Sequence, residues 1–216
     1  MPDTGFKYFR SVVSTFLPVI ILAVSCAAQV HGQAMAARTI SELVSSPARG
    51  AGTIVSTVYR GERSISDLSA SIPSFFEGYT APLPLYPVRS WDIRFLSTDF
   101  DGSQVTIHAQ VFAPVLTTPA ELPLYVFASG TTGLGDDCAP SLELPEERRW
   151  GWYTQNMLAY ASQGYLVVFP DYTGFHDPQR LQRYFSKYAE GYMMLDAIRA
   201  GRSFFASPAT AGLAAR

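Results

Sequence analysis

The sequence is poor in charge and in cysteine. Charged residues make up 16% of its 216 residues, and 16 basic against 18 acidic side chains give a formal net charge of −2. A nucleic-acid partner is therefore not expected, because such proteins gather Lys and Arg on one surface. Two cysteines are too few for a disulfide-stapled mini-protein or for a zinc site with four cysteine ligands, and no metal or other cofactor is expected.

The apolar run near the N-terminus is too short for a stable membrane span. This run, Val12–Val24, is interrupted by Pro18, whereas a span needs about 20 apolar residues. Lys7 and Arg10 precede it and small residues follow it, which is the order found in a secretory signal peptide. We therefore expect residues 1–34 to be a signal peptide and the protein to be secreted or periplasmic.

The way in which this signal peptide is processed has several interpretations. Cleavage fits after Ala34 or after Ala28. A lipoprotein signal with Cys26 acylated is an alternative, although Ala23 is unusual at the first position of that motif, and an uncleaved anchor helix is another. Cleavage after Ala34 would leave Cys138 as the single cysteine of the mature chain.

The sequence has ample apolar material for one globular domain. Hydrophobic residues make up 48%, with 12 Tyr, 14 Phe and 3 Trp, and this composition excludes a disordered tail. Residues 35–86 are rich in Ser, Gly and Pro and predict an irregular leader with one amphipathic piece at Ile65–Phe76. Phe75, Phe76 and Tyr79 are expected to pack this leader on a sheet that begins near residue 87.

A hairpin is predicted first. Apolar and polar residues alternate from residue 88 to 95 and again from 105 to 111, which is the period of a half-buried strand. Asp101-Gly102 between them is a turn signal. The inward positions are predicted to be Trp91, Ile93 and Phe95 on the first strand and Val105, Ile107, Ala109 and Val111 on the second.

The pattern then changes to strands alternating with helices. Leu122–Ala128 and Tyr165–Phe169 are continuous apolar runs, as expected for strands buried on both faces. Arg149–Gln163 has helical spacing and ends before Gly164, and a second helix is expected to run to about Arg202. Its buried stripe is predicted to be Tyr184, Tyr188, Leu195 and Ile198. This order favours an α/β fold with a mostly parallel sheet and an N-terminal antiparallel hairpin.

The loop after the first buried strand is the most informative segment. Residues 128–141 read Ala-Ser-Gly-Thr-Thr-Gly-Leu-Gly-Asp-Asp-Cys-Ala-Pro-Ser, and such loops hold the functional sites of open α/β sheets. A phosphate cradle is disfavoured, because two aspartates and two prolines follow where a helix N-terminus should face the phosphate. An oxyanion-hole loop that donates backbone N–H groups, or a simple connecting turn, are the other interpretations.

This loop resembles a signature of the secreted lipases of the lipase A type, an α/β-hydrolase family. Gly130–Gly133 and Cys138–Ser141 match its Gly-Thr-Thr-Gly and Cys-Ala-Pro-Ser motifs, and Ser129 stands where His is frequent. Further matches follow the family's order, and the resemblance covers about residues 65–203. These matches are Ser97–Gly102, Tyr160–Tyr165, Pro170–Gly174 and Glu190–Ala200.

The resemblance implies an exported carboxylic ester hydrolase, a lipase or esterase acting on a small-molecule ester or lipid with a Ser–Asp–His triad. It also implies an oxyanion hole at Gly130, Thr131 and Thr132, in which Thr131 or Thr132 donates its N–H. Gly-x-Ser-x-Gly, the nucleophile motif, occurs nowhere in the 216 residues. We therefore expect residues 87–216 to be the N-terminal half of the domain, truncated before the nucleophile strand and without any residue of the triad.

The remaining histidines, Asp171 and Cys138 are not expected to be catalytic. His108 is expected on the solvent face of the hairpin, His176 near the crevice without a catalytic role, and Asp171 as a loop cap. The resemblance suggests that Cys138 forms a disulfide with a region absent from the chain, and a buried free thiol is the alternative. The alternative function is a non-catalytic exported fragment or binding protein that keeps the hydrolase-like sheet.

Overall fold

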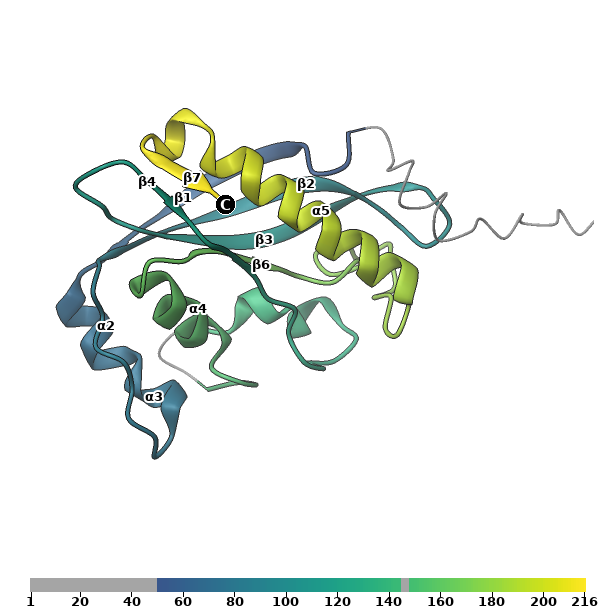
Figure 1. Cartoon of the computed structure of the whole chain (residues 1–216). Coiled ribbons are helices and arrows are strands. Elements are labelled where there is room, and N and C mark those ends of the chain that lie inside the picture. The colour runs from purple at the N-terminus through teal and green to yellow at the C-terminus, as the bar shows by residue number, and fades with distance from the viewer. Residues whose placement is uncertain (1–49, 145–147) are drawn as a thin grey trace, which may run out of the picture. The chain divides into compact units, whose positions relative to one another are not determined.

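The computed structural model describes residues 50–144 and 148–216 (Figure 1). The predicted signal peptide, with Cys26 and both cleavage sites, lies outside the described residues, as does the first part of the predicted leader. The described chain forms a five-stranded sheet in the order β1-β2-β3-β6-β5 and a two-stranded sheet of β4 and β7.

The predicted hairpin is confirmed. Strands β2 (Val88–Thr98) and β3 (Gln104–Pro114) pair antiparallel without a register shift, from Val88 opposite Pro114 to Thr98 opposite Gln104. All seven residues predicted to point inward are buried, with 6% or less of their surface exposed. Gly102 has φ +85°, so the turn between the strands uses the left-handed backbone that glycine adopts without strain.

Strand β1 (Ile54–Arg63) is a correction to the predicted irregular leader. It pairs antiparallel with β2 along the sheet edge. Most of the residues on each of its two faces are exposed. Because neither face is buried, its sequence carries no alternation that would have predicted a strand. The helices α2 (Ile65–Ser71) and α3 (Pro73–Phe76) follow, and Phe76 packs on the core while Tyr79 is 84% exposed, contrary to prediction.

The described sheet is mixed rather than mostly parallel. Strand β6 (Leu166–Pro170) is antiparallel to β3 and parallel to β5 (Leu124–Val126), so three of the four pairings in the five-stranded sheet are antiparallel. The unpredicted β1 adds one of these pairings. A second parallel pair joins β4 (Ala120–Leu122) to β7 (Leu213–Ala215), and only Pro123 separates β4 from β5.

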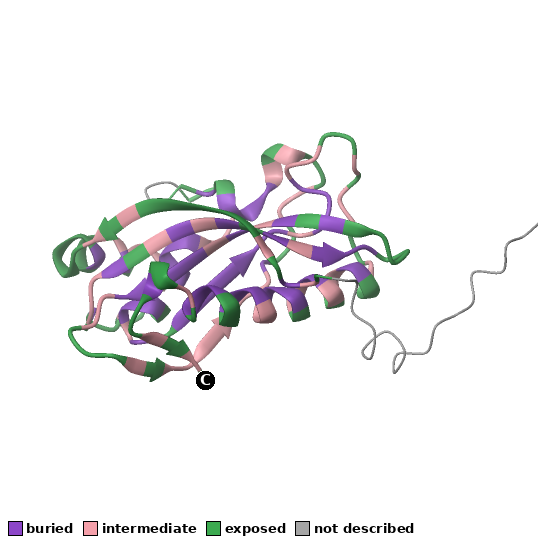
Figure 2. Cartoon of the chain, turned by 90° about the horizontal axis from the view of Figure 1, so that it is seen from above, coloured by how far each residue is buried: buried purple, intermediate pink, exposed green. Residues whose placement is uncertain are grey.

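Helices cover both faces of the sheet (Figure 1). Helix α5 (Lys187–Phe205) packs on one face, and α4 (Tyr153–Ser162) packs on the other together with α2. Consecutive residues of β6 enter the two cores alternately, so every residue of this strand is buried, as predicted for a strand between two helical layers (Figure 2).

The buried stripe of α5 differs from the predicted one. Tyr188 and Leu195 are 37% and 42% exposed, whereas the side of the helix that faces the sheet consists largely of small residues. Small side chains let the helix axis approach the sheet closely, and the core is then filled by the larger side chains of the strands. The buried positions include Ala189, Met193, Ala197, Ala200, Gly201 and Phe204.

Short 3-10 turns, η1 (Asp136–Cys138) and η2 (Pro140–Leu142), lie between β5 and α4, and a third, η3 (Pro208–Thr210), precedes β7. Within the described ranges, no helix combines the length and the apolar character that crossing a membrane requires.

Candidate functional site

The loops after β5 and β6 lie at the same edge of the sheet. The two strands are parallel neighbours, so residues 127–135 and 171–186 both leave from the carboxyl ends of their strands. The hydroxyl of Tyr172 donates a hydrogen bond to the carbonyl oxygen of Ser129 at 2.6 Å and joins the two loops. This edge is where open α/β sheets place their ligands.

Hydrogen bonds to two tyrosines hold the turn Gly130–Thr132, and two backbone N–H donors of the turn stay free. The N–H of Gly130 donates to the Tyr153 hydroxyl at 3.1 Å, and the Thr131 hydroxyl lies 2.9 Å from the Tyr184 hydroxyl. In the part of the chain that the structure describes, the N–H groups of Thr131 and Thr132 donate to no other group. Burial raises the pKa of Tyr153, so this phenol stays neutral beside the loop.

A cavity of about 150 Å³ borders this turn. Its wall is formed by the Gly-rich loop, and Tyr172, Tyr184, Phe185 and Glu190 line the opposite side. Phe185 is 81% exposed at its mouth, and Leu134 and Leu181 on the same two loops are also largely exposed. The cavity therefore combines free N–H donors with apolar side chains at the surface.

Cys138 packs closely against Gly133 of the same loop. A Cβ placed on Gly133, where φ is +136°, would overlap with Cys138 Sγ, so glycine is required both for the backbone and for the close approach. Cys138 is a free, partly buried cysteine among the described residues. The disulfide with an absent region stays a prediction.

A second polar cluster, here called the Asp171 cluster, consists of His108, Ser141, Asp171 and His176. One carboxylate oxygen, Asp171 Oδ2, lies 2.9 Å from His108 Nδ1, 2.7 Å from His176 Nε2 and 2.5 Å from Ser141 Oγ. The other oxygen, Oδ1, accepts the N–H of Ser141 at 2.9 Å. Asp171 has 1% of its side chain exposed, His108 14% and His176 22%.

The charged forms of His108 and Asp171 stabilise each other. Burial works against a charged His108, but hydrogen bonds to Asp171 and Asp92 outweigh it and raise the pKa of His108 to about 9. Burial likewise opposes ionisation of Asp171, and the hydrogen bonds from His108, His176 and Ser141 keep its pKa below the usual value. The buried carboxylate is therefore held in its charged form.

The Asp171 cluster contains the residue types of a hydrolase triad without the geometry of one. A triad needs the acid on one imidazole nitrogen and the serine on the other. Here both Asp171 Oδ2 and Ser141 Oγ face the same Nε2 of His176, at 2.7 and 3.3 Å. The serine hydroxyl also donates directly to the carboxylate, so no base is placed to activate it.

Sequence reasoning missed this cluster. His108 is not on a solvated face, because the segment after β6 and η2 cover it, and Asp171 is a buried hub rather than a loop cap. The missing signal was strand pairing: β3 and β6 pair with Ala109 opposite Pro170, which brings the next residues, His108 and Asp171, together. The N–H of Asp171 donates to the carbonyl oxygen of His108 at 2.9 Å.

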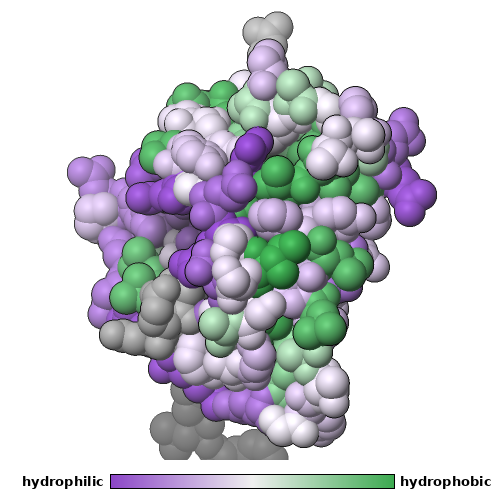
Figure 3. Space-filling model, turned by 90° about the vertical axis from the view of Figure 1, so that its left-hand side faces the viewer, coloured by the Kyte–Doolittle hydropathy of each residue, from purple (hydrophilic) through white to green (hydrophobic). Residues whose placement is uncertain are grey.

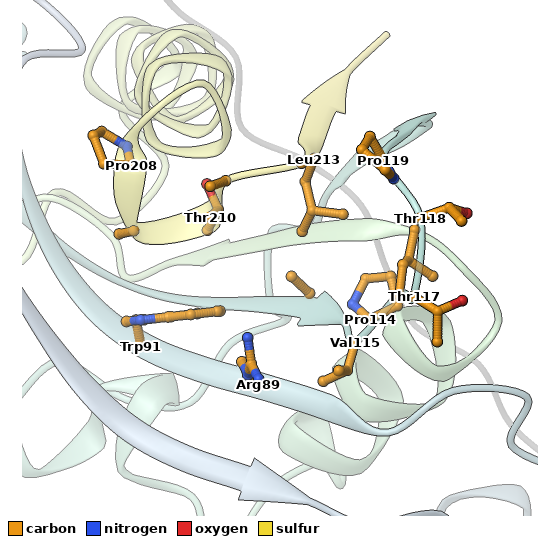
Figure 4. Close-up of a pocket in the computed structure, with 15 residues that line it drawn as sticks. Arg89, Trp91, Pro114, Val115, Thr117, Thr118, Pro119, Pro208, Thr210 and Leu213 are labelled. Carbon is orange, nitrogen blue, oxygen red and sulfur yellow. The ribbon is translucent and has the colours of Figure 1, made fainter.

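Another cavity, of about 330 Å³, lies at the opposite end of the sheet and lacks catalytic groups. Figure 4 shows Trp91, Pro114 and Leu213 around it, and Arg89 is its one titratable lining residue. Figure 3, which looks onto the left-hand side of Figure 1, shows apolar side chains in small groups separated by polar ones. The two polar sites described above lie elsewhere, at the carboxyl edge of β5 and in the Asp171 cluster.

Comparison with solved structures finds a similar fold in part of an esterase and of a putative hydrolase, whereas no family model and no curated protein matches the sequence. The rice cell wall degrading esterase LipA from Xanthomonas oryzae aligns over 72% of this chain with a TM-score of 0.54 and 20% identity. A putative hydrolase from Legionella pneumophila aligns over 70% with a TM-score of 0.56 and 18% identity. The chain has part of an α/β-hydrolase fold. 

The α/β-hydrolase likeness agrees with the resemblance read from the sequence, and it extends over only part of each relative. The aligned region covers 38% of the Xanthomonas esterase and 39% of the Legionella hydrolase. Candida antarctica lipase A in its closed state also aligns, over 73% of this chain and 33% of its own, with a TM-score of 0.47 and 22% identity.

Proposed function

We propose that this chain carries the oxyanion-hole part of an exported carboxylic ester hydrolase, a lipase or esterase acting on a small ester or lipid. The observation that carries the proposal is the pair of free N–H groups at Thr131 and Thr132, which border a cavity at the carboxyl edge of β5. In this fold, one oxyanion donor comes from the loop that follows this strand. The other donor comes from the residue after the nucleophile.

The cavity suits an ester with an apolar acyl group. Donors aimed at one point stabilise the negative oxygen that develops when a carbonyl is attacked, and one such donor typically contributes about 3 to 4 kcal/mol in the transition state. The aromatic rings of Phe185 and Tyr184, which line the cavity together with the donors, would contact the acyl chain. The Thr131 hydroxyl adds a polar group where Ser129 replaces the frequent histidine of the resembling family.

The part of the proposal that concerns catalysis is that the triad is not contained in these 216 residues. The sequence has no Gly-x-Ser-x-Gly, and the Asp171 cluster has the wrong geometry to replace it. We therefore expect the purified chain to hydrolyse p-nitrophenyl butyrate no faster than buffer or a heat-denatured sample. Hydrolysis that a serine-directed phosphonate abolishes would contradict the absence of a triad.

The oxyanion assignment is tested on the chain itself by its backbone amides. A short carboxylate such as butyrate resembles the product and presents an anionic oxygen with an apolar tail. We expect titration with butyrate to shift the amide NMR signals of Thr131 and Thr132, whereas butanol, which lacks the anion, shifts them less. Thr131→Pro removes one donor and should weaken the response at Thr132.

The control for this titration is a loop residue away from the cavity. Asp101 in the hairpin turn should show no shift at any butyrate concentration. If the amides of Thr131 and Thr132 also stay unchanged, the oxyanion assignment is wrong, and the alternative of a non-catalytic protein with the same sheet is favoured.

A further inference from the structure

Three side chains converge on one buried oxygen atom, Asp171 Oδ2. Groups from His108, His176 and Ser141 all lie within 2.9 Å of this atom. The second oxygen is also occupied, by the N–H of Ser141. Two imidazole nitrogens and one buried carboxylate thus converge on a single small volume.

We propose that His108, Asp171 and His176 bind a divalent transition-metal ion, with zinc(II) as the ion that best fits the set. Their potential ligand atoms lie within 4.8 Å of one another. Two histidines with one carboxylate are a known ligand set for zinc, and a water or a further side chain completes the tetrahedron. Magnesium and calcium are disfavoured because they prefer oxygen ligands throughout.

Two of the three ligands are positioned by the sheet. His108 and Asp171 are joined by a backbone hydrogen bond of 2.9 Å where β3 and β6 stop pairing, so their side chains leave the backbone at a fixed separation. His176 comes from the loop five residues later and has φ +63°, an uncommon backbone conformation that turns it back toward Asp171.

The surroundings provide the outer partner that metal-bound histidines usually have. To bind the ion, His108 would release its Nδ1 proton and coordinate through that nitrogen. Its Nε2 lies 3.6 Å from Asp92 Oδ2. Asp92 is itself held by an ion pair with Arg60. A carboxylate on the remaining nitrogen fixes the ring orientation and the tautomer, and such partners typically change metal affinity ten- to hundredfold.

The ion would have a route in and room for a fourth ligand. His108 and His176 line cavities of about 340 Å³ and 820 Å³, and Ser141 lines the larger one. Metal–ligand bonds of about 2.0 to 2.1 Å at the tetrahedral angle separate ligand atoms by roughly 3.3 Å. The present contacts of 2.7 and 2.9 Å to Asp171 therefore need to widen by only about half an ångström.

This site is independent of the proposed ester hydrolysis. The ion would join β3 to the loop after β6. It would therefore stabilise the fold, because an ion that binds the folded chain alone raises the free energy of unfolding by mass action.

The test uses the full chain, stripped of metal with a chelator and dialysed. Titration with zinc(II) against a chromophoric chelator should give one tight site per chain. A hundredfold excess of zinc over its Kd should raise Tm by about 5 to 10 °C. Cobalt(II), used as a spectroscopic probe, should give the intense visible absorption of a four-coordinate ion.

His176→Asn is the ligand variant, because Asn tolerates a positive φ and should leave the loop intact. It should lose at least a hundredfold in zinc affinity and the rise in Tm. Asp177→Asn is the matched control: this partly exposed carboxylate is the next residue and lines the smaller cavity, but lies outside the ligand set. It should keep the wild-type affinity.

The histidine ring signals in the NMR spectrum of the wild-type chain give a readout without any variant. Zinc should shift two imidazoles, those of His108 and His176, and leave that of His31 unchanged. The proposal is overturned if wild-type chain and His176→Asn bind zinc equally, or if one equivalent of zinc leaves both rings unshifted.

Discussion

Asp171 and Asp99 are two buried carboxylates that are stabilised in different ways. Asp171 is surrounded by imidazoles and a hydroxyl, whereas Asp99 is fully buried in the hairpin turn and pairs with Arg183 at 3.1 Å and Arg180 at 3.5 Å. Both arginines belong to the loop after β6. Asp99 therefore anchors the loop that supplies His176 and one wall of the cavity beside Thr131.

Asp99→Asn should lower the free energy of unfolding by about 3 kcal/mol. The substitution leaves two arginines facing a neutral group in a partly buried place, and removing one partner of a buried ion pair typically costs 3 to 5 kcal/mol. The lower value applies because Arg180 and Arg183 are about one third exposed. Urea denaturation followed by circular dichroism would measure it.

The control for Asp99→Asn is Asp101→Asn in the same turn. Asp101 is exposed and accepts one N–H from Ser103 at 2.9 Å, so its loss should cost less than about 1 kcal/mol. Equal losses from the two variants would show that the buried ion pairs of Asp99 do not stabilise the loop.

Helix α4 shows how an element can depend on a distant side chain. The N-cap residue Trp152 does not cap the helix with its side chain, because an indole has a donor but no acceptor. Glu143 supplies the acceptor instead: its Oε1 accepts the N–H groups of Arg149, Trp150, Gly151 and Trp152 at 2.7 to 3.1 Å, and its other oxygen accepts that of Tyr153. The N–H groups of Trp152 and Tyr153 belong to the helix start, where donors are left unpaired, and the other three belong to the turn before it.

Glu143→Gln should therefore destabilise the fold by about 2 to 4 kcal/mol. The amide keeps the shape but loses the charge and one acceptor, and it turns an NH₂ group toward backbone N–H donors. Thermal and urea unfolding would measure the loss. Glu121→Gln, at an exposed position of β4, should change stability by less than about 0.5 kcal/mol; a comparable loss there would contradict the role of Glu143.

Helix α5 contains two glycines in opposite surroundings. Gly191 is exposed with open space around it, whereas a Cβ at Gly201 would lie 2.8 Å from Val168 Cγ2 on β6. Gly191→Ala should stabilise the fold by about 0.5 to 1 kcal/mol through helix propensity. Gly201→Ala should destabilise it by about 1 kcal/mol, because overpacking against a stiff buried strand outweighs that gain.

The two glycine variants serve as controls for each other. Both change the same residue type in the same helix, so urea unfolding curves measured side by side separate helix propensity from packing. A stabilising Gly201→Ala would mean that α5 moves away from the sheet easily.

The elements could be predicted where local sequence determines them. The alternating pattern around Trp91 and Ile107 gave the hairpin, and continuous apolar residues gave β6, because burial on one or two faces leaves a direct mark on the sequence. The exposed strand β1 left no such mark. The Asp171 cluster depends on the pairing of β3 with β6, a contact between residues far apart in the chain, and no local pattern encodes it.

At the scale of the whole molecule, the fold places three features in different regions. Free N–H donors lie at the carboxyl end of β5, the Asp171 cluster lies between β3 and the loop after β6, and the largest apolar cores lie between the sheet and its two helical layers. The loop 171–186 contacts both polar sites. A change in the Asp171 cluster could therefore alter the wall of the cavity without touching Thr131.

The predicted export concerns the whole chain and can be tested independently of its fold. Residues 1–34 have the charged, apolar and small-residue order of a signal peptide, and we expect cleavage after Ala34 when the full chain is produced in a secreting bacterial host. Mass spectrometry of the exported protein should then find residues 35–216. The mass should be identical in Cys26→Ser, because Cys26 is removed with the signal.

Exported protein that begins at Met1 contradicts cleavage. A lipidated N-terminus at Cys26, absent in Cys26→Ser, contradicts the predicted site and would mean that the chain is held at a membrane surface by its acyl groups.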